Sequence, residues 1–163
     1  MVGYLSTYYQ KTMLGWGFLI DSIFSDKKRF KYLTKVMPDS LQMMYAMLDM
    51  FAMFQWNRVA IYYTPNQAQL CDTMINDVIT AFSDDALSYT VDVVQKVAYN
   101  GQDSDYLTEQ LLRTKRITRI VLICLDTAQY RRTFMKKVSL MDMISEEYVY
   151  VMIGVRGFGF GRQ

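Results

Sequence analysis

Few residues in this chain of 163 amino acids could carry out chemistry by themselves. It contains no histidine, which excludes imidazole general bases, Ser-His-Asp triads and metal sites that need an imidazole ligand. Its two cysteines, Cys71 and Cys124, are too few for a zinc site. Neighbouring acids at 84–85 and 146–147 lie at the expected ends of elements, where caps and solvated loops are more usual than an acid/base pair. These residue types predict a non-catalytic chain with no metal and no cofactor.

The composition is that of a folded domain without a strong electrostatic preference. Hydrophobic residues make up 52% of the chain and aromatic residues 15%, far more than a disordered chain contains. The 18 Lys and Arg nearly balance the 16 Asp and Glu, and the net charge of +2 gives no reason to expect a nucleic-acid partner. The basic clusters at 27–31, 113–119 and 131–137 are interpreted as solvated faces or helix ends.

No segment predicts export or membrane insertion. Residues 1–5 lack the basic region, apolar region and small-residue cleavage site of a signal peptide. The longest apolar stretch, residues 40–56, has Asp49 near its middle, which is costly inside a bilayer. We therefore expect this stretch to be a buried helix and the chain itself not to insert into a membrane.

Hydrophobic spacing after residue 40 predicts helices and strands in alternation. The predicted strands lie at 58–63, 89–97, 120–124 (within the apolar range 117–125) and 148–153, and the predicted helices at 40–56, 64–82, 104–116 and 126–141. The second helix has the clearest start, with Thr64 as N-cap, Pro65 at the first helical position and Gln67 completing a capping box. Such alternation predicts an α/β fold in which a mostly parallel sheet lies between two layers of helices. Residues 1–39 lack this alternation, apart from one strand expected at 13–20.

The two cysteines occupy comparable places in the predicted fold. Cys71 lies in the first turns of the second helix, and Cys124 lies at the C-terminal end of the strand at 120–124. In a doubly wound sheet both positions fall at the same edge, where a disulfide with a Cα separation of about 5.5 Å becomes feasible. Two free buried thiols fit the pattern equally well, so spacing leaves both states open.

Five segments occur in an order that is typical of one family. They are Ser-Asp-Lys-Lys-Arg-Phe at 25–30, Val-Met-Pro-Asp-Ser at 36–40, Phe-Gln-Trp-Asn-Arg-Val-Ala-Ile-Tyr-Tyr-Thr at 54–64, Arg-Ile-Val-Leu-Ile-Cys-Leu-Asp-Thr-Ala at 119–128 and Tyr-Val-Tyr-Val-Met-Ile-Gly at 148–154. Together they resemble the extracellular, natriuretic-peptide-receptor-like ligand-binding region of receptor guanylyl cyclases, and the nematode sensory branch most of all. The resemblance extends over essentially the whole chain.

The resemblance implies an incomplete type I periplasmic-binding-protein-like fold, in which two Rossmann-like lobes enclose a ligand. Residues 40–154 would form the second lobe, residues 1–39 a remnant of the first lobe with the crossover, and residues 155–163 the start of the return crossover. The resemblance also implies a disulfide between Cys71 and Cys124, and a place on the extracellular side of the cell membrane, where such bonds persist.

The implied function is signal reception for cGMP signalling, with guanylate cyclase activity in a separate domain. Ligands of doubly wound folds meet the loops after the strands, and the polar residues that we expect there are Thr64, Asn66, Asp126 and Thr127. For Thr64 and Asp126, helix capping is the better-supported role. The ligand would be a peptide or small molecule, and a second copy could bind through the first lobe. The alternatives are a small-molecule or amino-acid sensor without a cyclase, and a truncated product with no independent function.

Overall fold

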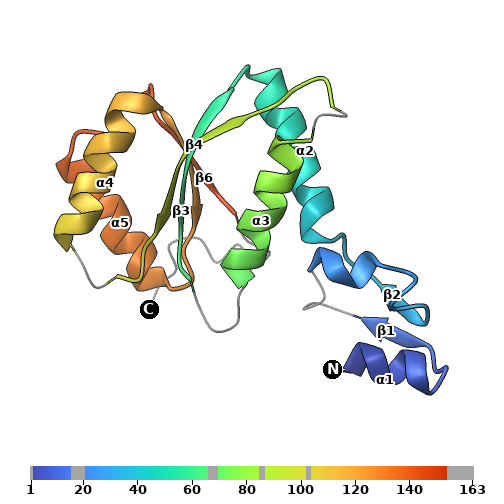
Figure 1. Ribbon diagram of the computed structural model, residues 1–163. Coiled ribbons are helices and arrows are strands. Elements are labelled where there is room, and N and C mark those ends of the chain that lie inside the picture. Colours follow the sequence, from blue (N-terminus) through green and yellow to red (C-terminus); the bar gives the residue numbers. More distant parts are fainter. Residues whose placement is uncertain (1, 16–20, 66–69, 85–86, 102–103, 154–163) are drawn as a thin grey trace.

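The computed structural model describes residues 2–15, 21–65, 70–84, 87–101 and 104–153 (Figure 1). Its main feature is a four-stranded sheet in the order β4-β3-β5-β6. The strands are β3 (Arg58–Tyr63), β4 (Asp92–Ala98), β5 (Ile120–Cys124) and β6 (Val149–Met152). Every neighbouring pair in this sheet is parallel. The predicted α/β fold with a parallel sheet is therefore confirmed.

Four helices enclose this sheet in two layers (Figure 1). α2 (Ser40–Met53) and α3 (Leu70–Phe82) cover one face, and α4 (Ser104–Ile117) and α5 (Ala128–Leu140) cover the other. Strand β3 shows why both faces are apolar: Val59 and Ile61 pack with the α2–α3 layer, whereas Ala60 and Tyr62 pack with the α4–α5 layer. Such continuous apolar strands are typical of parallel sheets covered on both sides. We call the four strands and their four helices the four-stranded lobe.

A smaller N-terminal unit precedes this lobe and consists of α1 (Val2–Tyr8), β1 (Met13–Gly15) and β2 (Leu33–Lys35). Its two strands pair with each other in parallel and do not join the larger sheet. Phe30 is buried beneath Tyr4, with ring centroids 5.1 Å apart. The unit also includes a 3-10 turn, η1 (Ser22–Ser25), which lies between its strands in sequence and packs through Phe24 against Phe30, with ring centroids 5.3 Å apart. Part of the strand expected at 13–20 is thus present, and residues 16–20 lie outside the described residues.

Several predicted boundaries are wrong, for local reasons. α2 ends at Met53 and not at residue 56, because Gln55 adopts a left-handed φ of 57° and the Trp56 amide turns back to the Phe51 carbonyl. Thr64 and Pro65 are not helical, and α3 is described only from Leu70 onward. The predicted helix start at Pro65 is therefore incorrect.

Strands β4 and β6 are shorter than, or shifted from, their predicted ranges. Strand β4 runs to Ala98, one residue beyond the predicted end at 97, and β6 keeps only the central part of the range 148–153. Strand β5 has the bounds of the predicted strand at 120–124. In the part of the chain that the structure describes, no helix combines the length and apolar character that a bilayer crossing requires.

Candidate functional site

The C-terminal edge of the four-stranded sheet brings together the loops in which ligand contacts were predicted. Strands β3 and β5 are neighbours there, and the amide of Thr64 donates to the carbonyl of Cys124 over 2.9 Å. On the other side of β3, the amide of Tyr99 donates to the carbonyl of Tyr63 over 2.8 Å. Residues distant in sequence, from the loops after β3, β4 and β5, therefore meet at one edge.

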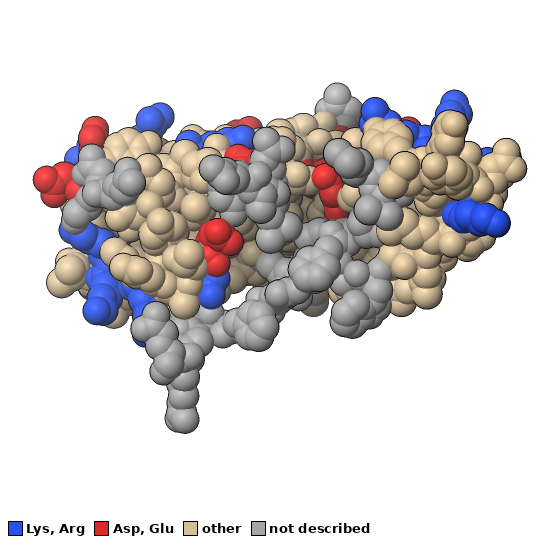
Figure 2. All heavy atoms as spheres, turned by 90° about the horizontal axis from the view of Figure 1, so that it is seen from below, with Lys and Arg blue, Asp and Glu red and all other residues tan. Residues whose placement is uncertain are grey.

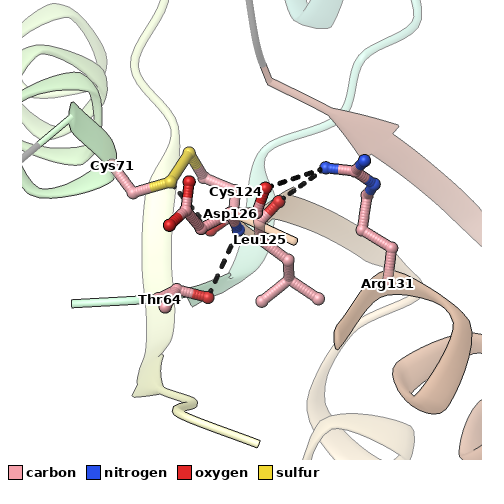
Figure 3. Close-up of a disulfide and its surroundings, with 6 residues drawn as sticks. All are labelled: Thr64, Cys71, Cys124, Leu125, Asp126 and Arg131. Atoms are coloured by element: carbon pink, nitrogen blue, oxygen red, sulfur yellow. Dashed lines mark hydrogen bonds between the residues drawn. A yellow bond between two sulfur atoms is a disulfide. The ribbon is translucent and has the colours of Figure 1, made fainter. Parts of the chain in front are cut away.

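Thr64 lies at this edge and, like Pro65, is not itself helical. Its side chain is buried, and its hydroxyl oxygen accepts a hydrogen bond from the Asp126 amide over 3.4 Å. The hydroxyl thus binds the neighbouring loop across the sheet edge (Figure 3), whereas residues 66–69, which a Thr64 cap would have to contact, lie outside the described residues. Asn66, the next predicted contact, lies outside the described residues.

The helix-capping role that the sequence predicted for Asp126 belongs to Thr127. Thr127, not Asp126, is the N-cap of α5, and its hydroxyl oxygen accepts from the Tyr130 amide over 3.2 Å. The Asp126 side chain is consequently not required for capping, and it is exposed at the edge. Of the predicted contacts that are described, Asp126 is the one that presents a carboxylate to solvent.

A disulfide joins Cys71 near the start of α3 to Cys124 at the end of β5, with a Cα separation of 5.7 Å (Figure 3). Both residues are buried. The pairing implied by the family resemblance is thus confirmed, and the free-thiol alternative is wrong. Because the bridge spans two neighbouring strand-to-helix connections, it restricts how far they can separate.

Arg131 supports the same loop and was not predicted as a site residue. One guanidinium nitrogen, Nη1, donates to the carbonyl of Leu125 over 2.9 Å and to that of Asp126 over 3.4 Å (Figure 3). Its Nε atom is buried and has no partner among the described residues. The sequence placed Arg131 in a basic cluster on a solvated face, whereas the side chain lies partly buried over the loop.

Two tyrosines and a glycine form the part of the edge that follows β4. Tyr99 is buried and packs edge-on against Tyr130, with ring centroids 5.9 Å apart. Burial, together with the nearby Tyr130, raises the pKa of Tyr99 above its usual value. Gly101 has a left-handed φ of 79°, and a Cβ there would lie 2.3 Å from the Tyr130 ring. Only glycine suits this position, because both the backbone conformation and the space exclude a side chain.

The described residues of this edge carry several kinds of hydrogen-bonding group. They are the hydroxyls of Thr64 and Thr127, the carboxylate of Asp126 and the phenol of Tyr99. Among those residues, no three His, Cys, Asp or Glu side chains are grouped so that they could hold a metal ion. Seen from the side of this edge, acidic and basic side chains are interspersed with uncharged ones (Figure 2).

Comparison with known proteins agrees with a binding role. The sequence model of the receptor family ligand-binding region matches residues 1–157. The chain is 36% identical over 162 residues to the receptor-type guanylate cyclase gcy-4 of Caenorhabditis briggsae, covering 99% of this chain and 14% of that protein. It is 35% identical over 163 residues to gcy-1 of Caenorhabditis elegans, covering 100% of this chain and 14% of that protein. The chain thus spans only about one seventh of the length of these relatives.

Proposed function

This chain belongs to the family of receptor ligand-binding regions, and from that premise we propose that it receives a ligand for a receptor-type guanylate cyclase. The observation that carries the proposal is the match of residues 1–157 to this family. The cyclase reaction itself belongs, in this proposal, to another domain of the receptor, and the present chain contributes no catalytic group. Its output would be a change in cGMP production, caused by a ligand at the edge of the sheet.

The proposed arrangement is that of two lobes, of which residues 40–154 form the second. Residues 1–39 would contribute to the first lobe and to the crossover, and residues 155–163 would begin the return. The separation between the two-stranded and four-stranded sheets supports this division. In parallel α/β folds, ligands bind outside the carboxyl ends of the strands, which is where Thr64, Asp126 and Thr127 lie.

The ligand that we propose is a small molecule or peptide with polar groups that complement the Asp126 carboxylate and the Thr127 loop. The disulfide and the Arg131 contacts hold this loop in place, and a preorganised loop loses less entropy on binding. We also propose an extracellular location, because the family match and the disulfide both suit an oxidising compartment. Association with a second copy would involve the first lobe.

The test is a thermal-shift screen of the purified 163-residue chain against single amino acids and short peptides. We expect members of one chemical class to raise the melting temperature, because a ligand that binds only the folded state stabilises it. Asp126→Ala should reduce this shift, whereas Ser139→Ala, an exposed change near the far end of α5, should retain it. A shift that Asp126→Ala leaves unchanged would contradict binding at this edge. Production of cGMP by the purified chain would contradict the non-catalytic role.

A further inference from the structure

A group of polar side chains joins the N-terminal unit to the four-stranded lobe. We call it the junction cluster, and it consists of Ser22, Ser25, Lys35, Asp39, Ser40 and Asp77. The two carboxylates are buried, with Asp77 8% exposed and Asp39 4% exposed. Buried carboxylates are costly unless they are hydrogen-bonded or paired with a cation, so the partners of each one show what the cluster does.

Asp77 connects three elements that are distant in sequence. It lies on α3, and its Oδ1 accepts from the hydroxyl of Ser22, in η1, over 3.0 Å. Its Oδ2 accepts from the hydroxyl of Ser40, the first residue of α2. Ser40 begins α2, whereas Asp77 lies in the middle part of α3. Asp77 thus connects η1 with both helices.

Asp39 makes a second connection beside the first. It is the N-cap of α2, where its Oδ1 accepts from the Gln42 amide over 2.9 Å. Its Oδ2 accepts from the Ser25 hydroxyl and from Lys35 Nζ, the latter over 3.1 Å. Lys35 Nζ also donates to Ser25 Oγ over 2.5 Å. Burial opposes ionisation of Asp39, but these hydrogen bonds and the lysine charge outweigh it and hold its pKa below the usual value.

The junction cluster has the position needed to set the angle between the two parts. Strands β1 and β2 pair only with each other among the described strands, so no shared sheet fixes the N-terminal unit to the lobe. Lys35 is the last residue of β2, and Ser22 and Ser25 are the first and last residues of η1. The cluster therefore includes residues of the N-terminal unit from both β2 and η1. Hydrogen bonds are directional and exchange partners readily, unlike an interdigitated apolar core.

We propose that the junction cluster fixes the orientation of the N-terminal unit on the four-stranded lobe, and that loss of the Ser22–Asp77 hydrogen bond releases it. This orientation can be measured in the present chain without a ligand or another domain of a receptor. Its use in signalling rests on the proposed function, since a receptor region of two lobes reports its ligand by changing the angle between them.

The test measures one distance between the two parts, in the absence of any ligand. Spin labels are attached to Thr12→Cys, beside β1, and to Ser139→Cys on α5, both at exposed positions. The native cysteines are paired and do not react with the label. Pulsed electron–electron double resonance then gives the distribution of distances between the two labels. It is measured in the wild-type background and in Ser22→Ala, Asp77→Asn and Thr80→Ala. Thr80→Ala is the matched control, because that exposed hydroxyl on α3 donates only to the Asn76 carbonyl of its own helix.

We expect a single narrow distribution for the wild-type background and for Thr80→Ala. Ser22→Ala should give a distribution about twofold broader or displaced, because one tie between the parts has opened. Wild-type distributions in both Ser22→Ala and Asp77→Asn would overturn the proposal. If the circular-dichroism spectrum shows that Asp77→Asn is unfolded, the Ser22→Ala distribution by itself decides whether the proposal holds. Ser22→Ala removes only one hydroxyl from a partly exposed residue. No ligand is involved, so a failed ligand screen and a failed junction test are separate results.

Discussion

The hydroxyl of Tyr62, in the middle of the sheet, lies 2.6 Å from the hydroxyl of Thr114 on α4. Both residues are fully buried. The Thr114 hydroxyl is in turn 2.9 Å from Gln95 Oε1 on β4, and Gln95 Nε2 donates to Gln110 Oε1 over 3.0 Å. A polar chain thus runs through an otherwise apolar layer and joins two strands to α4. Burial raises the pKa of Tyr62, which keeps its phenol protonated and able to donate.

Tyr62→Phe should destabilise the fold by about 1–2 kcal/mol, because it leaves the Thr114 hydroxyl without one of its buried partners. Urea unfolding followed by circular dichroism would measure this loss. Tyr8→Phe is the control, since Tyr8 is 79% exposed and its hydroxyl is solvated. Equal stability of the two variants would show that the buried hydroxyl contributes nothing.

Removal of the disulfide by Cys71→Ala together with Cys124→Ala should lower stability by about 2–4 kcal/mol, because the bridge closes a long loop in the unfolded chain. The cysteines are 53 positions apart in the sequence. Unfolding of the wild-type chain with and without dithiothreitol should give a similar difference. Mass spectrometry after alkylation of the non-reduced chain should find no modified thiol, and two modified thiols would contradict the bridge.

Thr127→Ala should cost about 1 kcal/mol, because it removes the side chain that caps α5. Asp126→Ala should change stability by no more than about 0.5 kcal/mol, since this exposed carboxylate does not cap the helix. Thermal unfolding of the two variants side by side is the measurement. A larger loss for Asp126→Ala than for Thr127→Ala would restore the capping role that the sequence predicted.

Acidification should remove the advantage that the wild-type chain has over Asp39→Asn. The pKa of Asp39 is lower in the folded chain than its usual value of 3.8, so the ionised group stabilises the fold. Its contribution is fully present above the unfolded pKa and is lost as the pH falls through the lower, folded pKa. Urea unfolding of both proteins between neutral pH and strongly acidic pH measures the difference. A gap that stays constant over this range would contradict an ionised, hydrogen-bonded Asp39.

Residue patterns were sufficient for the main architecture. The alternation of apolar strands and amphipathic helices after residue 40 predicts the parallel sheet, because each βα unit is short and its signals are local. The Cys71–Cys124 pairing was implied by the family resemblance, while spacing alone left it open.

Local sequence patterns did not predict the contacts between segments that are distant in sequence. Thr64, Pro65 and Gln67 form a plausible helix start in sequence, yet the Thr64 hydroxyl binds Asp126 across the sheet edge. Local capping signals gave no indication of this tertiary contact. The junction cluster was missed for the same reason, since Ser22 and Asp77 are 55 positions apart and neither belongs to a recognisable motif.

The disulfide also determines what a protease can remove. Between Cys71 and Cys124 the chain contains most of α3, all of β4 and α4, and most of β5. A single cut anywhere in that interval would open the polypeptide and yet leave the two pieces covalently joined. In the extracellular location that we propose, this region could be nicked by enzymes in its surroundings and would still keep β3 and β5, with the loops that follow them, in one molecule.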